Sequence, residues 1–186
     1  MVLKVLLVLF IILLIIATAV AIWTYEFTYV NRMSKRFDPL IINDSDKEYY
    51  GEMTEEMASS VKRMDEAEKK HVFIKSFDGL RLNGHLIDDF PGRPLVIFCH
   101  GYHGSYLRDG YGTFRYCMEH QLNLLMIEER AHCKSDGKVI TFGVYERRDV
   151  ADWVKYAKEI MPEGTKIILS GVSMGAATVM MSSDLL

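Results

Sequence analysis

The pattern of apolar and polar residues from position 71 onward predicts strands first. Residues 71–77 and 80–88 alternate apolar and polar side chains around Asp78-Gly79, which indicates a β-hairpin. Residues 94–99 and 122–127 are continuous apolar runs. Such runs are typical of strands that are buried on both faces of a parallel sheet.

Helical spacing of apolar residues appears between and after these runs. We expect helices at residues 111–120 and 141–161, a fifth strand at residues 166–170 and a further helix at residues 175–183. A hairpin followed by this alternation of strands and helices predicts an α/β domain over residues 71–186 with a mostly parallel sheet.

A long uncharged run lies near the N-terminus. The 21 residues 5–25 contain no charged side chain, and as a helix they would span roughly 31 Å, the thickness of the hydrocarbon core of a bilayer. Four aromatic residues form an interfacial belt at its end: Trp23, Tyr25, Phe27 and Tyr29. We therefore expect residues 1–25 to form one transmembrane helix that binds the lipid bilayer through residues 5–25.

A cleaved signal peptide is the alternative for this segment, because residues 17–19 and 19–21 both fit a small-x-small cleavage site. The run is longer than the usual apolar core of about 7–15 residues, and only Lys4 and the amino terminus precede it with positive charge. These features favour an uncleaved anchor. We expect a single-pass protein of the plasma membrane, with its orientation left open.

Residues 26–70 join this segment to the domain. Residues 26–50 are polar and aromatic and indicate a juxtamembrane linker. Residues 52–70 predict an amphipathic helix, and the apolar residues on one face of it are Met53, Met57, Val61 and Met64. We expect this face to pack against the domain.

Composition narrows the function classes. Of the 186 residues, 49% are apolar and 25% charged, which is typical of a globular chain, and the net charge of −3 gives no sign of a nucleic-acid partner. The three cysteines form no C-x-x-C pair, so neither a zinc site nor a disulfide framework is indicated. The chain contains no P-loop and no G-x-G-x-x-G motif. We expect no cofactor and no metal.

The motif with the clearest chemistry is Gly171-Val172-Ser173-Met174-Gly175, placed between the fifth strand and the last helix. Such a turn holds the serine in a strained backbone conformation above the edge of the sheet, and it leaves no room for side chains at positions 171 and 175. The N-terminal amides of the following helix can stabilise negative charge at the same place. Ser173 is therefore the candidate nucleophile.

Two further motifs follow strands. His100-Gly101-Tyr102-His103-Gly104 comes directly after residues 94–99, and residues 128–137 read E-E-R-A-H-C-K-S-D-G. With these motifs residues 71–186 resemble the α/β-hydrolase family, which has an H-G-x-x-G oxyanion loop, a D-x-R-G-H-G-x-S-x-G loop and a G-x-S-x-G nucleophile elbow. The second loop departs from the pattern at Glu128 and has Ala131 and Cys133 where the family has glycines.

The resemblance implies a partial α/β-hydrolase fold preceded by one transmembrane helix, most similar to membrane-anchored serine hydrolases of the aminopeptidase- and lipase-like branch. It assigns Ser173 as nucleophile and the backbone N–H groups of Tyr102 and Met174 as the oxyanion hole. His100 would shape its loop rather than act as the base. The residues that support the two loops would be His100, Gly101, Gly104, Gly171 and Gly175.

The rest of a catalytic triad does not follow Ser173 in this chain. The family supplies an acid and then a histidine after the serine, whereas all six histidines here precede Ser173 and the only later carboxylate is Asp184. Ending at residue 186 would also leave the apolar strand 166–170 with an unpaired edge. We expect the chain to be the N-terminal part of a longer enzyme and to be inactive alone.

Two hypotheses for function remain. The first is a membrane-anchored serine hydrolase that cleaves an ester, thioester or amide bond of a small-molecule or peptide acyl substrate through an acyl-enzyme. The alternative is a catalytically inactive, membrane-tethered binding or regulatory module with the same scaffold. An acid and a histidine beyond Leu186 would distinguish the two. The adjacent Glu128 and Glu129 are expected to be solvated or salt-bridged rather than a catalytic pair.

Overall fold

A five-stranded mixed sheet lies at the centre of the domain. The computed structural model describes residues 2–30, 51 and 53–186. The strands lie in the order β1-β2-β4-β3-β5, and their bounds are β1 (Lys70–Lys75), β2 (Arg81–Ile87), β3 (Leu95–Cys99), β4 (Asn123–Ile127) and β5 (Ile167–Gly171). The first two pair antiparallel, as does β2 with β4, whereas β3 lies parallel to both β4 and β5. The expected hairpin, the three later strands and the α/β fold class are confirmed.

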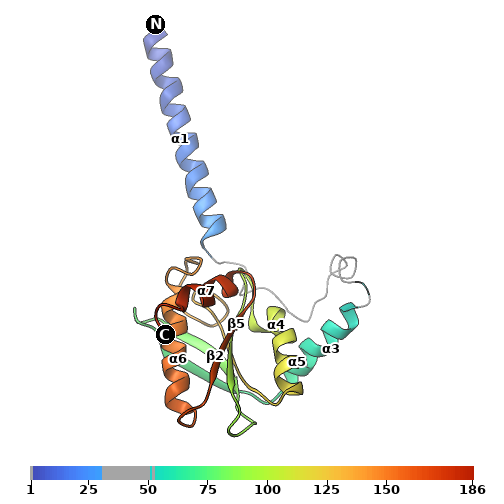
Figure 1. Cartoon of the computed structure of the whole chain (residues 1–186). Coiled ribbons are helices and arrows are strands. Elements are labelled where there is room, and N and C mark those ends of the chain that lie inside the picture. Colours follow the sequence, from blue (N-terminus) through green and yellow to red (C-terminus); the bar gives the residue numbers. More distant parts are fainter. Residues whose placement is uncertain (1, 31–50, 52) are drawn as a thin grey trace.

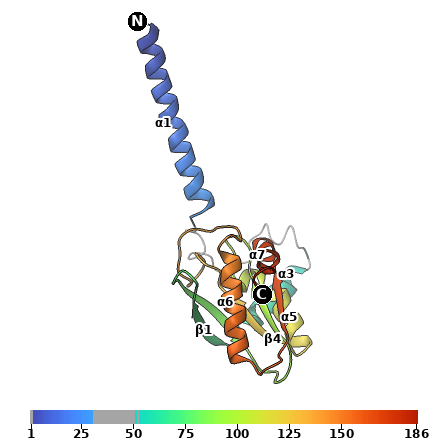
Figure 2. The ribbon, with the colours of Figure 1, turned by 60° about the vertical axis from the view of Figure 1, so that its left-hand side comes forward.

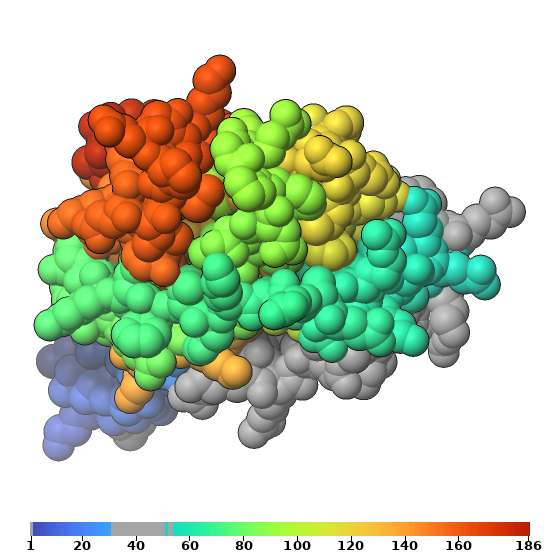
Figure 3. Space-filling model, turned by 90° about the horizontal axis from the view of Figure 1, so that it is seen from below, coloured from blue at the N-terminus to red at the C-terminus, as the bar shows by residue number. Residues whose placement is uncertain are grey.

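Helices cover both faces of this sheet (Figures 1 and 2). One face carries α6 (Glu146–Ile160), with α7 (Met174–Ser182) beside it. The other face carries α3 (Met53–Glu66), α4 (Tyr106–Asp109) and α5 (Tyr111–Glu119). Seen from the end of the domain away from α1, α3 (turquoise) continues the surface of α5 (yellow) (Figure 3). An ion pair between Arg115 and Glu56 joins these two helices.

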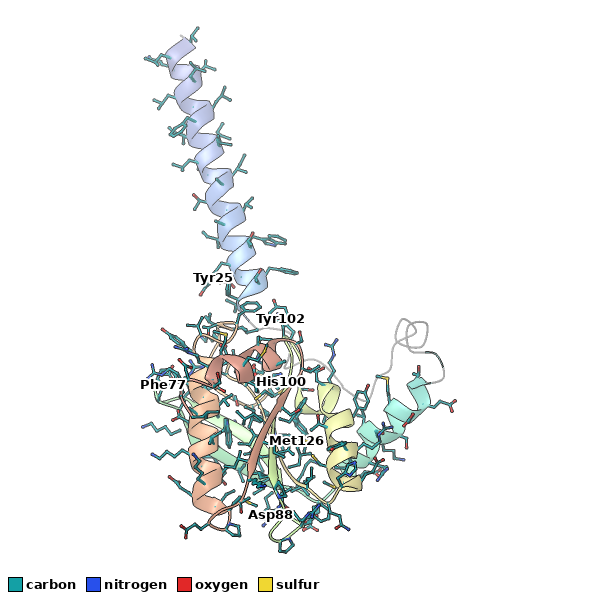
Figure 4. The ribbon with its side chains drawn as sticks, viewed as in Figure 1. Tyr25, Phe77, Asp88, His100, Tyr102 and Met126 are labelled. Atoms are coloured by element: carbon teal, nitrogen blue, oxygen red, sulfur yellow. The ribbon has the colours of Figure 1, made fainter. Side chains whose placement is uncertain are left out.

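The alternation of side chains along the central strands divides the core into two layers. Ile97 and Leu125 point to the α6 side, where they pack with the fully buried Trp153. Phe98 and Met126 point to the opposite side, where they pack with Met64 of α3 (Figure 4). Strands that are buried on both faces must be apolar at every position, which explains the continuous runs in the sequence.

The strand β5 lies at one edge of the described sheet. It pairs with β3 on one side, and the side chain of Ile168 is 44% exposed. Among the described residues no strand covers its other edge. An apolar strand with a free edge is a site at which further chain can pair.

The first helix, α1 (Val2–Thr28), extends away from the domain (Figures 1 and 2). Its 27 residues correspond to about 40 Å, and it is long and apolar enough to cross a membrane. It continues to residue 28, so the expected linker from residue 26 begins inside the helix. The remainder of that linker, residues 31–50, lies outside the described residues.

The helix expected at residues 52–70 ends earlier, at Glu66. The ammonium group of Lys69 donates to the carbonyl oxygens of Met64 and Asp65, at 3.0 and 2.6 Å, and so binds carbonyl groups that the helix end leaves free. Val61 and Met64 are buried, as expected for a packing face. The side chain of Met53 lies outside the described part of the chain.

The helix expected at residues 141–161 begins later, at Glu146. The Glu146 carboxylate accepts hydrogen bonds from the backbone N–H groups of Thr141 and Gly143, at 2.7 and 2.8 Å. These bonds curl residues 141–145 into a loop before the first helical turn. The apolar spacing alone placed the start of the helix too early, because it does not reveal that Glu146 binds the backbone of the residues before it.

Candidate active site

Ser173 stands at the turn between β5 and α7. Its backbone has φ +52° and ψ −118°, and its side chain makes no capping hydrogen bond to the helix. A positive φ is strained for a residue with a side chain, at a cost of about 1–3 kcal/mol. The turn is held by Val172 N–H, which donates to the Cys99 carbonyl oxygen at 3.2 Å, and by Gly175 N–H, which donates to the Val172 carbonyl oxygen at 2.9 Å. The exposed serine is thus fixed by backbone alone.

The two glycines of this turn are required by close backbone contacts. A Cβ atom at Gly171 would lie 2.5 Å from the carbonyl carbon of Gly175. One at Gly175 would overlap the carbonyl oxygens of Cys99 and His100. The start of α7 is therefore pressed directly onto the C-terminal end of β3, and no side chain fits between them.

The loop after β3 is held by a carboxylate that the sequence motifs did not reveal. Asp109, in the short helix α4, accepts a hydrogen bond of 2.8 Å from Gly101 N–H. A Cβ atom at Gly104 would overlap this carboxylate. The sequence signal for α4 is Ser105, whose hydroxyl accepts from Arg108 N–H at 3.1 Å as a helix N-cap.

The structure brings the loop after β3 next to the serine. A Cβ atom at Gly101 would lie 3.4 Å from Cβ of Ser173. Met174 is buried in a cluster with Ile140, and Tyr102 packs against that cluster. Among the described residues, the backbone N–H groups of Tyr102 and Met174 have no hydrogen-bond acceptor. The two free N–H groups therefore belong to the residue after the serine and to the loop that approaches it.

His100 is fully buried, and both of its ring nitrogens are hydrogen-bonded. Its Nδ1 lies 2.9 Å from the Gly101 carbonyl oxygen, and its Nε2 accepts from Glu129 N–H at 3.1 Å. This pattern requires a neutral ring with the proton on Nδ1. Burial lowers the pKa of His100 and so favours that form. The ring joins the loop after β3 to the loop after β4.

The loop after β4 has the positive φ angles that usually require glycine, although other residues occupy these positions. Ala131 and Cys133 stand where the related motif has glycine, and both adopt positive φ, +63° and +47°. Arg130 anchors the loop, because its guanidinium donates to both carboxylate oxygens of Asp149, at 2.6 and 2.7 Å, and to Asp78 at 2.9 Å. This bidentate pair fixes the loop to α6 and to the hairpin.

Glu128 and Glu129 occupy opposite environments. Glu128 lies 2.9 Å from Nε2 of His85 and accepts from Lys134 N–H at 2.7 Å; burial alone would raise its pKa, but these hydrogen bonds hold the pKa below its usual value.

Glu129 is 3% exposed, and neither of its carboxylate oxygens has a hydrogen-bond partner among the described residues. Burial, together with the nearby Glu146 and Asp149, raises the pKa of Glu129 well above its usual value. The expected solvated or salt-bridged role is therefore wrong for Glu129, whereas Glu128 has the side chain of His85 as its partner.

The described residues give little support for a reactive cysteine or for a metal site. Burial raises the pKa of the Cys133 thiol to about 12, which disfavours the reactive thiolate. Within residues 2–30, 51 and 53–186, no group of three or more His, Cys, Asp and Glu side chains is arranged to hold a metal ion. The serine turn remains the candidate active site.

We predict that Gly175→Ala lowers the free energy of unfolding by at least about 2 kcal/mol, because its methyl group must push α7 away from backbone that cannot yield. Gly112→Ala is the matched control. A Cβ at Gly112, in α5, meets nothing within 4 Å, so that variant should keep or gain up to about 1 kcal/mol. Chemical unfolding in detergent measures both, and equal stability of the two variants would refute the close contact.

We predict that Glu129→Gln stabilises the protein increasingly as the pH rises. Because the folded-state pKa is raised, the folded chain holds a proton that the unfolded chain releases above about pH 4.3, and stability is lost as the pH rises towards the folded pKa. The amide removes this loss, which grows by about 1.4 kcal/mol for each pH unit between the unfolded-state and folded-state pKa values. Melting curves at pH 5 and pH 8 should show a larger gain at pH 8.

Glu128→Gln provides the contrast for this prediction. It weakens the hydrogen bonds with His85 and Lys134 and should cost about 1 kcal/mol at pH 8. A loss of stability in Glu129→Gln at pH 8 as large as that in Glu128→Gln would contradict the assignment of Glu129 as an unpartnered buried acid.

Comparison with curated proteins gives a distant sequence relative. No family model matches the sequence. An uncharacterised protein of Bacillus subtilis, YqkD, is 26% identical over 117 residues, which cover 63% of this chain and 38% of YqkD. It shares sequence with the chain but carries no stated activity.

Solved structures give a closer match. The Pyrococcus furiosus esterase Pf2001 is 33% identical with a TM-score of 0.57, over 63% of this chain and 48% of the esterase. Est1E of Butyrivibrio proteoclasticus, solved with bound ferulic acid, is 26% identical with a TM-score of 0.53, over 61% of this chain and 47% of Est1E. The chain thus spans less than half the length of these relatives. Together with the mixed sheet, these similarities identify the chain as a relative of the α/β hydrolases, with the fold of that family.

Proposed function

We propose that the protein is a membrane-anchored serine hydrolase that cleaves an ester, thioester or amide bond, with Ser173 as the nucleophile. The observation that carries the proposal is the backbone of Ser173, which is exposed at the start of α7 with φ +52° between two glycines that admit no side chain. A serine held in this way is the geometry of a nucleophile elbow. The similarity to esterases supports the same chemistry.

The proposed reaction uses the groups around the turn together with a general base. Oγ of Ser173 attacks the carbonyl carbon of the substrate, and its proton passes to a general base. The carbonyl oxygen becomes an oxyanion, to which the N–H groups of Tyr102 and Met174 donate. Each such donor contributes about 3 kcal/mol to the stability of the transition state. The leaving group departs with the proton, and water then hydrolyses the acyl-enzyme to release the acid.

Neither of the two fully buried histidines, His100 and His132, is suited to act as the general base. Both ring nitrogens of His100 are engaged. In His132, Nδ1 donates to the Arg130 carbonyl oxygen at 2.8 Å, and burial lowers the pKa to about 3, so the ring is a poor proton acceptor. A base and its acid after Ser173, in the order of the family, remain a prediction from the sequence.

Labelling with a fluorophosphonate probe tests the nucleophile. We predict that the intact protein in native membranes is labelled and that Ser173→Ala abolishes the labelling, because the probe reacts with an activated serine. Ser183→Ala, at an exposed serine whose hydroxyl only donates to the Met180 carbonyl oxygen, is the control and should keep full labelling. Labelling that persists in Ser173→Ala would refute the nucleophile, and a wild-type protein that is never labelled would favour an inactive module.

Membrane anchoring rests on α1, whose apolar side chains are exposed along its length. An exposed apolar helix of 27 residues is unfavourable in water and favourable in a bilayer.

We predict that the protein stays in the membrane pellet after extraction with alkaline carbonate and keeps its first residues. N-terminal sequencing checks the second point. A soluble product that begins at Val20 or Ile22, after the two small-x-small sites, would show that the segment is a cleaved signal peptide.

A further inference from the structure

The C-terminal end of α1 is joined to the same loops that surround the candidate nucleophile. The hydroxyl group of Tyr102 donates a hydrogen bond of 2.7 Å to the Thr28 carbonyl oxygen. The Tyr29 carbonyl oxygen accepts one of 2.8 Å from Ile140 N–H, and a single antiparallel bridge at Val30 extends this pairing. Tyr102 therefore connects the end of the apolar helix with the proposed oxyanion hole.

The length of α1 places this contact relative to a bilayer. The uncharged run ends at Tyr25, and the first charged residue after it is Glu26. Thr28 lies three residues beyond Tyr25, which is about 5 Å along a helix. With residues 5–25 in the hydrocarbon core, the hydroxyl of Tyr102 lies at the level of the lipid headgroups.

An exposed apolar loop begins at the same point. Phe142 stacks on Tyr102 with 5.2 Å between ring centroids and meets Tyr29 edge-on at 5.7 Å. Phe142 is 39% exposed, and Val144 and Tyr145, which follow it in the same loop, are 56% and 47% exposed. We call Phe142, Val144 and Tyr145 the apolar collar. Exposed aromatic and aliphatic side chains near the end of a membrane-spanning helix are typical of residues that enter a membrane interface.

Ser173 lies at this end of the domain as well. In two views α1 extends from the end at which α7 begins (Figures 1 and 2), and Tyr102 lies between Tyr25 and His100 (Figure 4). Gly101, the neighbour of Tyr102, approaches Ser173 closely. The site and the apolar collar therefore share the face that α1 holds against the bilayer.

We infer that the site takes its substrate from the membrane, and that the substrate class is long-chain acyl esters dissolved in the bilayer. This inference rests on the proposed hydrolase function. An acyl chain in lipid leaves its ester group at the level of the headgroups, where Tyr102 and Ser173 lie.

Two esters with the same leaving group test the inference. The intact protein is placed in phosphatidylcholine vesicles, and hydrolysis of 4-methylumbelliferyl palmitate, which dissolves in the bilayer, is compared with that of the soluble acetate. Val144→Asp puts a charge into the apolar collar and should lower the initial rate on palmitate about fivefold or more, with the rate on acetate within about twofold. Val144→Ser should give a smaller loss of the same kind.

Ile160→Asp is the matched control. Ile160 is 40% exposed at the C-terminal end of α6, which lies away from α1 because α6 runs antiparallel to β5. It should leave both rates unchanged.

Three results would overturn the inference that the substrate comes from the membrane. They are equal losses on both esters in Val144→Asp, no loss in Val144→Asp, and a wild-type protein that cleaves acetate alone. Failure of the hydrolase proposal looks different, because the wild type would then cleave neither ester and Ser173 would not be labelled.

Discussion

The contact between the start of α7 and the end of β3 is the constraint on which the site depends. With no side chain at Gly175, the first turn of the helix rests on the carbonyl oxygens of Cys99 and His100. This contact sets the length and path of the preceding turn, so Ser173 must adopt φ +52°. Burial of Met174 behind the turn offsets part of the strain. The serine is thus positioned by packing of the backbone and needs no side-chain partner.

Three polar contacts fix the neighbouring loops relative to this turn. Asp109 holds the loop after β3 through Gly101, and His100 joins that loop to the backbone of Glu129. Arg130 then anchors the loop after β4 to α6 through Asp149. All three are buried or half-buried, where hydrogen bonds are costly to leave unmade, and the bonds of Asp109 and Arg130 are strengthened by charge. A loss at one of them would move the backbone donors relative to Ser173.

The strands and the serine turn were predictable because their signals are local. A run such as residues 94–99 must be apolar where both faces of the strand are covered. The glycines of G-x-S-x-G directly indicate a tight turn that leaves no room for side chains on either side of the serine. Asp109 could not be found in this way, because its role depends on a short helix that brings it back to Gly101. The isolation of Glu129 and the bond from Tyr102 to Thr28 depend on tertiary packing between distant segments. Pattern alone does not specify such contacts.

The position of a covalent adduct tests the central claim most directly. After reaction of the intact protein with a fluorophosphonate, trypsin releases a peptide that begins at Ile167, after Lys166, and contains several serines, namely Ser170, Ser173, Ser182 and Ser183. Tandem mass spectrometry of this peptide identifies the modified serine. The account predicts an adduct on Ser173 alone. An adduct on another serine, with Ser173 unmodified, would contradict the nucleophile elbow as the catalytic centre.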